Sequence, residues 1–481
     1  MKTVLTTILS ALLLTACVGT APAPDPVYPI PAPKQVRWHQ METYAFIHFG
    51  LNTFNDMEWG YGDTDPKTFN PVHLDTEQWA KTFAEAGMKG VILTAKHHDG
   101  FCLWPTELTD YCIRNASYKD GKGDVVGELA AACRKYGLKF GVYLSPWDRN
   151  SADYGTPAYV TYYHAQLREL LTRYGDIFEV WFDGANGGDG YYGGARERRN
   201  IDRRTYYDFP KAWAMVEELQ PEAICFSDGG PGCRWVGNER GVAGTTNWAF
   251  LRAAEVYPGY PNADELNIGH PDGDTWIPAE CDVSIRPGWF YHESEDDKVK
   301  TADDLVELYY KSVGRGGNFL LNFPVNKEGL ISKTDSLNAV TFHQRITQEL
   351  SDNLLVNAKV EASDVRGRTF AATKVNDADF ETYWATPDEV TAGTLTFTFK
   401  EPQAVSKLLL QEYIPLGQRV QRFSVEVQRN GEWQSVEIDE ETTTIGYKRI
   451  VRFPQVTVDA LRVNFLEARG PLCISEVGAY K

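Results

Sequence analysis

The chain has 481 residues, a formal net charge of −18, and 13% aromatic residues. Its length exceeds that of one ordinary domain and predicts two folded parts with extensions. The negative charge argues against nucleic acid and phosphate-rich molecules as partners, and favours a neutral or cationic ligand.

The first residues have the features of a lipoprotein signal. Lys2 precedes an apolar stretch, and the sequence LTAC ending at Cys17 is typical of a bacterial lipobox. We therefore expect residues 1–16 to be removed and Cys17 to be lipidated, which would anchor the protein to a membrane of a bacterial cell envelope, in the periplasm or at the surface. An ordinary secretory peptide is the alternative. Residues 17–35 are rich in Pro and Ala, which predicts an unfolded spacer.

Four apolar runs in the next 150 residues end in polar or aromatic side chains. YAFIHFG ends beyond His48, GVILTAKHHDG contains His97 and His98, KFGVYLSPWD contains Tyr143, and IFEVWFDG leads into Asp183. Such runs fit parallel strands that are covered on both faces, and these strands carry active-site groups at their carboxyl ends.

Helical patterns separate these strands. They cover residues 75–87, 124–137 and 158–175, and each ends in Gly, the expected residue after a helix. Later strands are expected near residues 223–227, 281–285 and 318–323, with a poorly patterned middle. About eight βα units predict a (β/α)8 barrel over residues 36–350. The competing fold is a doubly wound open sheet, but no GxGxxG follows the first strand.

Asp183 is the first candidate for a catalytic group, because a buried strand runs directly into it and stops at Gly184. The alternative is an Asp that caps the next turn, since Asp followed by Gly is common turn chemistry. A second alternative makes His48, His97, His98 and Asp99 ligands of a divalent metal. The chain has no HExxH motif, and adjacent histidines on one strand tend to point to opposite faces, which disfavours the metal site.

From residue 351 the pattern changes to short alternating runs such as TLTFTFK and RFSVEVQRNGEWQSVEI. The RNGEW turn between two alternating strands is a hairpin signal. The sequence therefore predicts an all-β sandwich over residues 351–481.

Six motifs together resemble glycoside hydrolase family 29, the retaining α-L-fucosidases. They are FIHFG, EWG, KHHDGF, EVWFDG, RWVGNE and GRGGNFLLN, in the family's order and over nearly the whole mature chain. RWVGNE is similar to the branch that prefers α-1,3- or α-1,4-linked fucose. The resemblance implies a retaining exo-α-L-fucosidase that removes terminal fucose from fucosylated oligosaccharides through a covalent glycosyl-enzyme intermediate. A broad-specificity α-L-fucosidase and a non-catalytic cell-surface carbohydrate-binding protein are the alternatives.

Retaining hydrolysis requires two carboxyl groups about 5 to 5.5 Å apart. The resemblance implies Asp183 as the nucleophile and Glu239 as the general acid and base, with no cofactor for catalysis. We expect His97, His98 or Trp181 to stabilise the charge of Asp183, and Trp235 to raise the pKa of Glu239 through apolar contact. The competing carboxylates are Asp228, Glu280 and Glu293. The expected fucose-binding residues are His48, Glu58, Trp59, His97, His98 and Trp289 by resemblance, with Tyr143 and Trp181 as further lining residues.

The segment NDADFETYWAT from Asn376 resembles the start of discoidin-like domains, where a similar loop holds calcium. The resemblance implies a structural calcium ion with Asp377, Asp379 and Thr382 as ligands, since carboxylate and other oxygens suit this ion. A plain acidic turn is the alternative.

Overall fold

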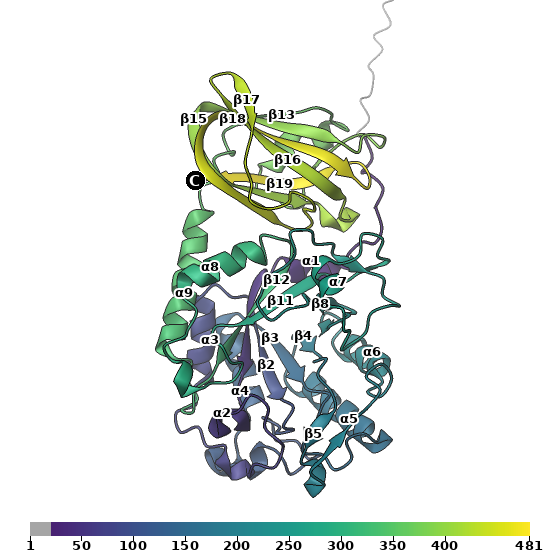
Figure 1. Ribbon diagram of the computed structural model, residues 1–481, viewed down its shortest axis with the longest axis vertical. Coiled ribbons are helices and arrows are strands. Elements are labelled where there is room, and N and C mark those ends of the chain that lie inside the picture. Colours follow the sequence, from purple (N-terminus) through teal and green to yellow (C-terminus); the bar gives the residue numbers. More distant parts are fainter. Residues whose placement is uncertain (1–20) are drawn as a thin grey trace, which may run out of the picture.

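The computed structural model describes residues 21–481, so the predicted signal and the lipidation site Cys17 lie outside the described residues. Eight parallel strands form a closed barrel in the order β1-β12-β11-β8-β7-β4-β3-β2, which confirms the predicted fold (Figure 1). The barrel strands are β1 Thr43–His48, β2 Gly90–Lys96, β3 Lys139–Leu144, β4 Ile177–Trp181, β7 Ile224–Ser227, β8 Cys233–Trp235, β11 Ala279–Ser284 and β12 Asn318–Pro324.

The helices that cover the barrel begin and end largely where the sequence predicts. Asp75 and Asp124 cap two of them, because their carboxylates accept hydrogen bonds from backbone N–H groups in the first turn. No helix lies between β7 and β8 in the described chain, so the later βα units are irregular, as expected. The helices are α1 Pro33–His39, α2 Leu51–Asn55, α3 Thr76–Glu85, α4 Val125–Tyr136, α5 Pro157–Arg173, α6 Phe209–Leu219, α7 Ala263–Ile268, α8 Ala302–Lys311 and α9 Lys333–Glu349. Two small hairpins extend the loops: β5 Gly188–Gly190 with β6 Glu197–Arg199, and β9 Phe250–Leu251 with β10 Thr275–Trp276.

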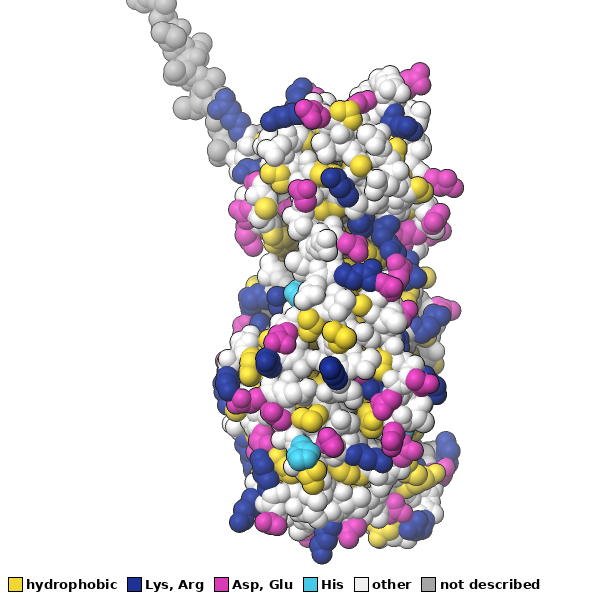
Figure 2. Space-filling model, turned by 90° about the vertical axis from the view of Figure 1, so that its left-hand side faces the viewer, with side chains coloured by type: hydrophobic (Ala, Val, Ile, Leu, Met, Phe, Trp, Pro, Cys, Tyr) yellow, Lys and Arg dark blue, Asp and Glu magenta, His cyan; other side chains and the backbone are white. Residues whose placement is uncertain are grey.

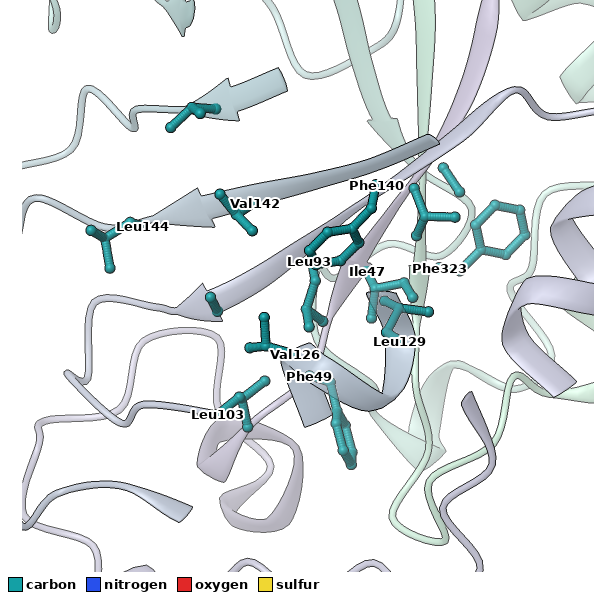
Figure 3. Close-up of a cluster of buried hydrophobic side chains, with 14 of the residues drawn as sticks. Ile47, Phe49, Leu93, Leu103, Val126, Leu129, Phe140, Val142, Leu144 and Phe323 are labelled. Carbon is teal, nitrogen blue, oxygen red and sulfur yellow. The ribbon is translucent and has the colours of Figure 1, made fainter. Parts of the chain in front are cut away.

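The largest apolar core lies between the barrel strands and the helices around them. Leu93 on β2, Phe140 on β3 and Leu129 on α4 point toward one another in Figure 3, and all three side chains are buried. Each buried side chain of this size stabilises the fold by about 1.5–3 kcal/mol relative to an exposed one.

The second domain is an antiparallel β structure with its own apolar core, as predicted. Its strands are β13 Lys359–Ala362, β14 Trp384–Ala385, β15 Gly393–Glu412, β16 Val420–Arg429, β17 Glu432–Ser435, β18 Arg449–Ala468 and β19 Cys473–Tyr480. The predicted hairpin joins β16 to β17 through Asn430 and Gly431, at φ 53° and 83°. Two central residues with positive φ are characteristic of the type I′ turn, whose twist matches that of the flanking strands.

The described part of the expected spacer differs from an unfolded segment. Although residues 21–32 form no helix or strand, they run along the β domain (Figure 1), and Val27 N–H donates to the carbonyl of Leu416 at 2.9 Å. Arg419 and Arg469 donate to the carbonyls of Asp25 (2.7 Å) and Tyr28 (2.8 Å). Arginines that are distant in sequence thus satisfy the carbonyls of a proline-rich segment, which has few N–H groups with which to form regular structure.

The β domain packs on the amino-terminal end of the barrel. Glu42, directly before β1, forms an ion pair with Lys448, and Arg315, before β12, forms one with Glu440 at 2.9 Å. Buried Gln418 accepts from Ala249 N–H at 2.8 Å and donates to the Asn247 carbonyl at 3.0 Å. The carboxyl ends of the barrel strands therefore face away from the β domain (Figure 1).

Surface charge is mixed on the face that Figure 2 shows. Lys and Arg side chains alternate there with Asp and Glu, so on this face the net charge of −18 is not gathered into one large acidic patch. Within residues 21–481, no helix has both the length and the apolar character needed to cross a bilayer.

Gln418→Ala tests the importance of the interface between the two domains. The substitution leaves buried backbone groups of residues 247 and 249 without partners, so we expect a loss of about 1–3 kcal/mol of stability. Urea unfolding followed by tryptophan fluorescence measures this loss. Gln434→Ala, on exposed β17, is the matched control and should change little; equal midpoints for both variants would contradict the prediction.

Candidate active site

The closed barrel brings six of the predicted site residues together at the carboxyl ends of β1 to β4. The rings of His48 and His97 are 5.5 Å apart, and those of His97 and His98 are 4.1 Å apart. Tyr143 stacks on Trp181 at 5.5 Å, and its hydroxyl donates to Asp183 at 3.0 Å. Barrel closure therefore places these strand ends around one site.

Asp183 lies at the centre of this group, with 23% of its side chain exposed. Burial raises the pKa of its carboxyl above the ordinary 3.8, while hydrogen bonds from Ala185 N–H (2.7 Å) and the Tyr143 hydroxyl lower it. The expected donors differ: Trp181 donates instead to Glu280 at 2.8 Å, and His98 Nε2 is 3.8 Å from Asp183 Oδ2. A tyrosine hydroxyl and a backbone amide therefore stabilise the charged form of Asp183.

The three histidines are neutral. Burial lowers the pKa of His48 and His98 to about 3 and holds the pKa of His97 well below its ordinary value. Each ring therefore offers one donor and one acceptor. Among the described residues, none forms a hydrogen bond with the Nε2 atom of any of the three rings.

Neighbouring side chains determine which ring nitrogen of each histidine carries the proton. The Ser145 hydroxyl donates to Trp147 O, so it must accept from His98 Nδ1 at 2.7 Å. Asn322 donates through its NH2 group to Trp289 O and Ser284 Oγ, so its Oδ1 accepts from His48 Nδ1 at 2.8 Å. The Nε2 atoms of His48 and His98 are consequently acceptors.

His97 has the opposite tautomer. The Asn52 Oδ1 atom accepts from Gly60 N–H, so its NH2 group faces His97 Nδ1 at 3.3 Å as a donor. The proton of His97 is then on Nε2. The three rings together present two acceptors and one donor.

Glu239 follows β8 on an exposed loop, and its Oε2 accepts from the Trp289 indole at 3.2 Å. Burial raises the pKa of Glu239 above the ordinary 4.5, the negative charges of Asp183 and Glu58 raise it further, and the Trp289 hydrogen bond lowers it. The Trp235 indole donates to Asp282 at 2.8 Å, and its apolar contact with Glu239 stays a prediction. Glu239 thus combines a raised pKa with electrostatic coupling to Asp183.

Glu58 and the tryptophans form the wall of the site. Trp289 packs on His48 at 5.1 Å, and half-exposed Trp59 meets His98 edge to face at 5.3 Å. The Glu58 carboxylate accepts from the backbone N–H groups of Trp289 (2.9 Å) and Phe290 (3.1 Å). In this structure Glu58 therefore holds the loop that carries Trp289.

Arg149 is a functional candidate that the sequence analysis missed. Its buried guanidinium donates to the carbonyls of Trp59 (2.7 Å), Gly60 (2.8 Å) and Asp189 (2.6 Å). It thereby ties the Trp59 loop to the β5–β6 hairpin. Its position in the sequence could have identified it, because Arg149 lies two residues after Trp147, directly after the polar end of the predicted strand KFGVYLSPWD.

The competing carboxylates are less well placed. Glu280 is fully buried in the barrel, and Glu293 is exposed in a short 3-10 turn. Asp228 follows β7 and accepts from Gly259 N–H, and burial raises its pKa to about 7. Of the three competing carboxylates, Asp228 is thus the one close to Asp183, and the charge of Asp183 contributes to the raised pKa of Asp228.

The histidine metal site is not formed. Within residues 21–481, only one set of three or more His, Cys, Asp or Glu side chains has its possible ligand atoms within 4.8 Å of one another. This set is Glu179, Cys233 and Glu280. The expectation that His97 and His98 point to opposite faces is also wrong. β2 ends at Lys96, before both residues, so strand alternation does not apply to them.

The predicted calcium ligands lie on one turn of the β domain. Asp377 Oδ2 accepts from Thr382 Oγ1 at 2.8 Å and from Lys374 at 3.3 Å, while Asp379 accepts from Glu381 N–H at 3.1 Å. The oxygen donors suit calcium, but the Lys374 ammonium competes with an ion for Asp377. Calcium at this turn stays a prediction.

Known proteins resemble this chain over nearly its whole length. A family model described as Alpha-L-fucosidase matches residues 27–342, and one described as F5/8 type C domain matches residues 359–477. Alpha-L-fucosidase 1 of Arabidopsis thaliana is 41% identical over 466 residues, which are 95% of this chain and 89% of that protein.

Solved structures agree with these matches. A glycoside hydrolase 29 family member from an unknown rumen bacterium is 45% identical, with a TM-score of 0.85 over 95% of this chain and 78% of that one. A Ruminococcus gnavus GH29 fucosidase in complex with fucose is 31% identical, with a TM-score of 0.85 over 96% and 97%. The chain is therefore a glycoside hydrolase that belongs to the α-L-fucosidase family, family 29, and its residues 359–477 form an F5/8 type C, or discoidin-like, domain.

Proposed function

We propose that the protein is a retaining exo-α-L-fucosidase that releases terminal α-1,3- or α-1,4-linked fucose. The observation that carries this proposal is the pair of Asp183 and Glu239 at the carboxyl end of the barrel, where the charge of Asp183 raises the pKa of Glu239. Asp183 attacks the anomeric carbon while Glu239 protonates the leaving oxygen. Glu239 then removes a proton from the water that hydrolyses the covalent intermediate.

The protonation states follow from the contacts of each carboxyl. Asp183 receives two hydrogen bonds that favour its charged form. Glu239 receives one, and the negative charge of Asp183 disfavours ionisation of Glu239. Glu239 therefore keeps its proton while Asp183 is ionised, which is the arrangement that acid-assisted attack needs.

Recognition of fucose uses the complementary histidines and the tryptophan wall. Sugar hydroxyls can donate to His48 and His98 and accept from His97, while Trp59 and Trp289 offer apolar faces for the ring and its methyl group. The similar R. gnavus fucosidase was solved in complex with fucose, which supports fucose as the ligand of this site. The linkage preference rests on the RWVGNE motif, which contains Glu239.

Asp183→Asn and Glu239→Gln should fail in different ways. Asp183→Asn loses hydrolysis of every fucoside, because no nucleophile remains. Glu239→Gln loses about 10²–10⁴-fold on a glycan. It should still cleave a nitrophenyl fucoside, whose leaving group needs no protonation, and added azide should accelerate turnover by attacking the intermediate without a base. Steady-state kinetics with and without azide test this, and equal losses on both substrates without azide rescue would contradict the role of Glu239.

The pH dependence of kcat/KM should be bell-shaped. Activity falls at low pH as Asp183 gains a proton and falls at high pH as Glu239 loses one, and both limbs lie above the ordinary values of 3.8 and 4.5. Trp289→Phe removes a hydrogen bond that lowers the pKa of Glu239, so the alkaline limb should move to higher pH. Trp59→Phe is the control, because in residues 21–481 the Trp59 indole forms no hydrogen bond with Asp183 or Glu239. An alkaline limb that stays in place in Trp289→Phe would refute the assignment.

Substrate choice tests the linkage proposal. We expect release of fucose from a Lewis-type trisaccharide and none from 2′-fucosylated lactose, measured by free-fucose analysis. Release from both would keep the mechanism and discard the linkage preference in favour of a broad-specificity enzyme. Release from neither would favour a carbohydrate-binding protein.

We further propose that a lipid at Cys17 anchors the enzyme in a bacterial cell envelope. The lipobox-like LTAC sequence supports this localisation. The full-length protein made in bacteria should partition into a detergent phase, and Cys17→Ala should partition into water. Detergent partitioning of the Cys17→Ala variant would exclude the lipid anchor.

A further inference from the structure

Two carboxyl groups lie inside the barrel, below the site. Glu179 on β4 and Glu280 on β11 are both fully buried, and a carboxyl oxygen of one lies within 4.8 Å of a carboxyl oxygen of the other. Within the described chain, neither carboxyl forms a salt bridge with a basic side chain; their other partners are Trp38, Tyr44, Trp181 and the thiol of Cys233. The mechanism proposed above uses neither group.

This pair must share a proton. Two adjacent carboxylates without a counter-ion are too costly to bury, so at least one carboxyl is neutral. Burial raises the pKa of both carboxyls, that of Glu179 well above its ordinary value. Both oxygens of Glu280 already accept hydrogen bonds, from Trp181 and Tyr44, whereas only Oε2 of Glu179 accepts one from an indole. The shared proton therefore belongs on Glu179, and Glu280 is the acceptor.

The acceptor position leaves Glu280 free to bind aromatic donors. Its Oε1 accepts from the Trp181 indole at 2.8 Å and its Oε2 from the Tyr44 hydroxyl, while Glu179 Oε2 accepts from the Trp38 indole at 2.9 Å. Asp282, two residues further along β11 and also buried, accepts from the Trp235 indole at 2.8 Å. Alternate residues of a strand share a face, so β11 presents two indole acceptors to the barrel interior.

Trp181 connects this pair to the nucleophile. One of its neighbours is Phe226, stacked at 3.8 Å and nearly parallel, and another is Tyr143, at 5.5 Å. The Tyr143 hydroxyl in turn donates to Asp183 at 3.0 Å. A fixed indole thus sets the position of the tyrosine that holds the reacting carboxylate.

We propose that Glu179 and Glu280 form a proton-sharing pair whose role is to position Trp181, and through it Tyr143 and Asp183. Both glutamates are positioning residues and do not touch the substrate. The inference rests on the proposed role of Asp183 as nucleophile.

A metal ion is the competing interpretation of the same cluster, since Glu179, Glu280 and Cys233 could each offer a ligand atom. The hydrogen bonds argue against it, because Trp38, Tyr44 and Trp181 already donate to the carboxyl oxygens and the pair shares a further proton. The Cys233 Sγ atom lies 3.9 Å from Glu179 Oε1, a distance that is typical of a weak hydrogen bond from a thiol.

A double-mutant cycle on Glu280 and Trp181 tests the proposal. Glu280→Met removes the acceptor at similar length and should lower kcat by about tenfold to a hundredfold, with little change in KM, because a small displacement of the nucleophile is enough for such a loss. Glu280→Gln keeps an acceptor oxygen and should restore most of kcat. The double variant with Trp181→Phe should be no slower than the slower single variant. Cys233→Ala, a change in the same core at a residue whose thiol makes only a 3.9 Å contact with Glu179, is the control.

Three results would overturn the proposal: multiplicative losses in the cycle, a kcat for Cys233→Ala as low as that of Glu280→Met, or a stoichiometric metal in the purified enzyme. If Glu280→Met does not fold, infrared difference spectra decide. Wild type at neutral pH should show a protonated carboxyl band that Glu179→Gln lacks, and its absence would also overturn the shared proton. Activity of Asp183→Asn is measured in parallel. Its loss together with unaffected Glu280 variants would refute this inference alone, and its retention would refute the proposed function.

Discussion

The active site depends on keeping one carboxylate charged in a largely buried, neutral setting. Among residues 21–481, no Lys or Arg forms a salt bridge with Asp183, and burial keeps the nearby imidazole of His98, 3.8 Å away, uncharged. The charge of Asp183 depends on two hydrogen bonds, from Tyr143 and from Ala185 N–H. The surrounding barrel holds these two donors, the Tyr143 hydroxyl and the Ala185 N–H, in position.

Neutral histidines have a second consequence. A neutral ring can be an acceptor or a donor at Nε2, and the side chains of Asn322, Ser145 and Asn52 decide which. A sugar with several hydroxyls on one side is suited to such a mixed set. The same residues would recognise hydroxyls poorly if the rings were protonated, since they would then be donors only.

Much of the site could be predicted from the sequence because it depends on strand ends. Apolar runs that stop at His48, His97, Tyr143 and Asp183 predict a parallel barrel, and barrel closure brings those residues together. The contacts between loops could not be predicted in this way. The Trp289 indole donates to Glu239, because a loop after β11 folds over the site and Glu58 holds its backbone. Likewise, the described part of the proline-rich segment docks on arginines about 400 residues away.

The central claim is that Asp183 forms a covalent bond to the sugar. A 2-deoxy-2-fluoro fucoside with a good leaving group slows hydrolysis of the intermediate, so the enzyme can be digested and its peptides weighed by mass spectrometry. The account predicts one fluorofucosyl group on the peptide that contains Asp183, and none in Asp183→Asn. A label on Asp228 or Glu239, or turnover without any labelled peptide, would contradict it.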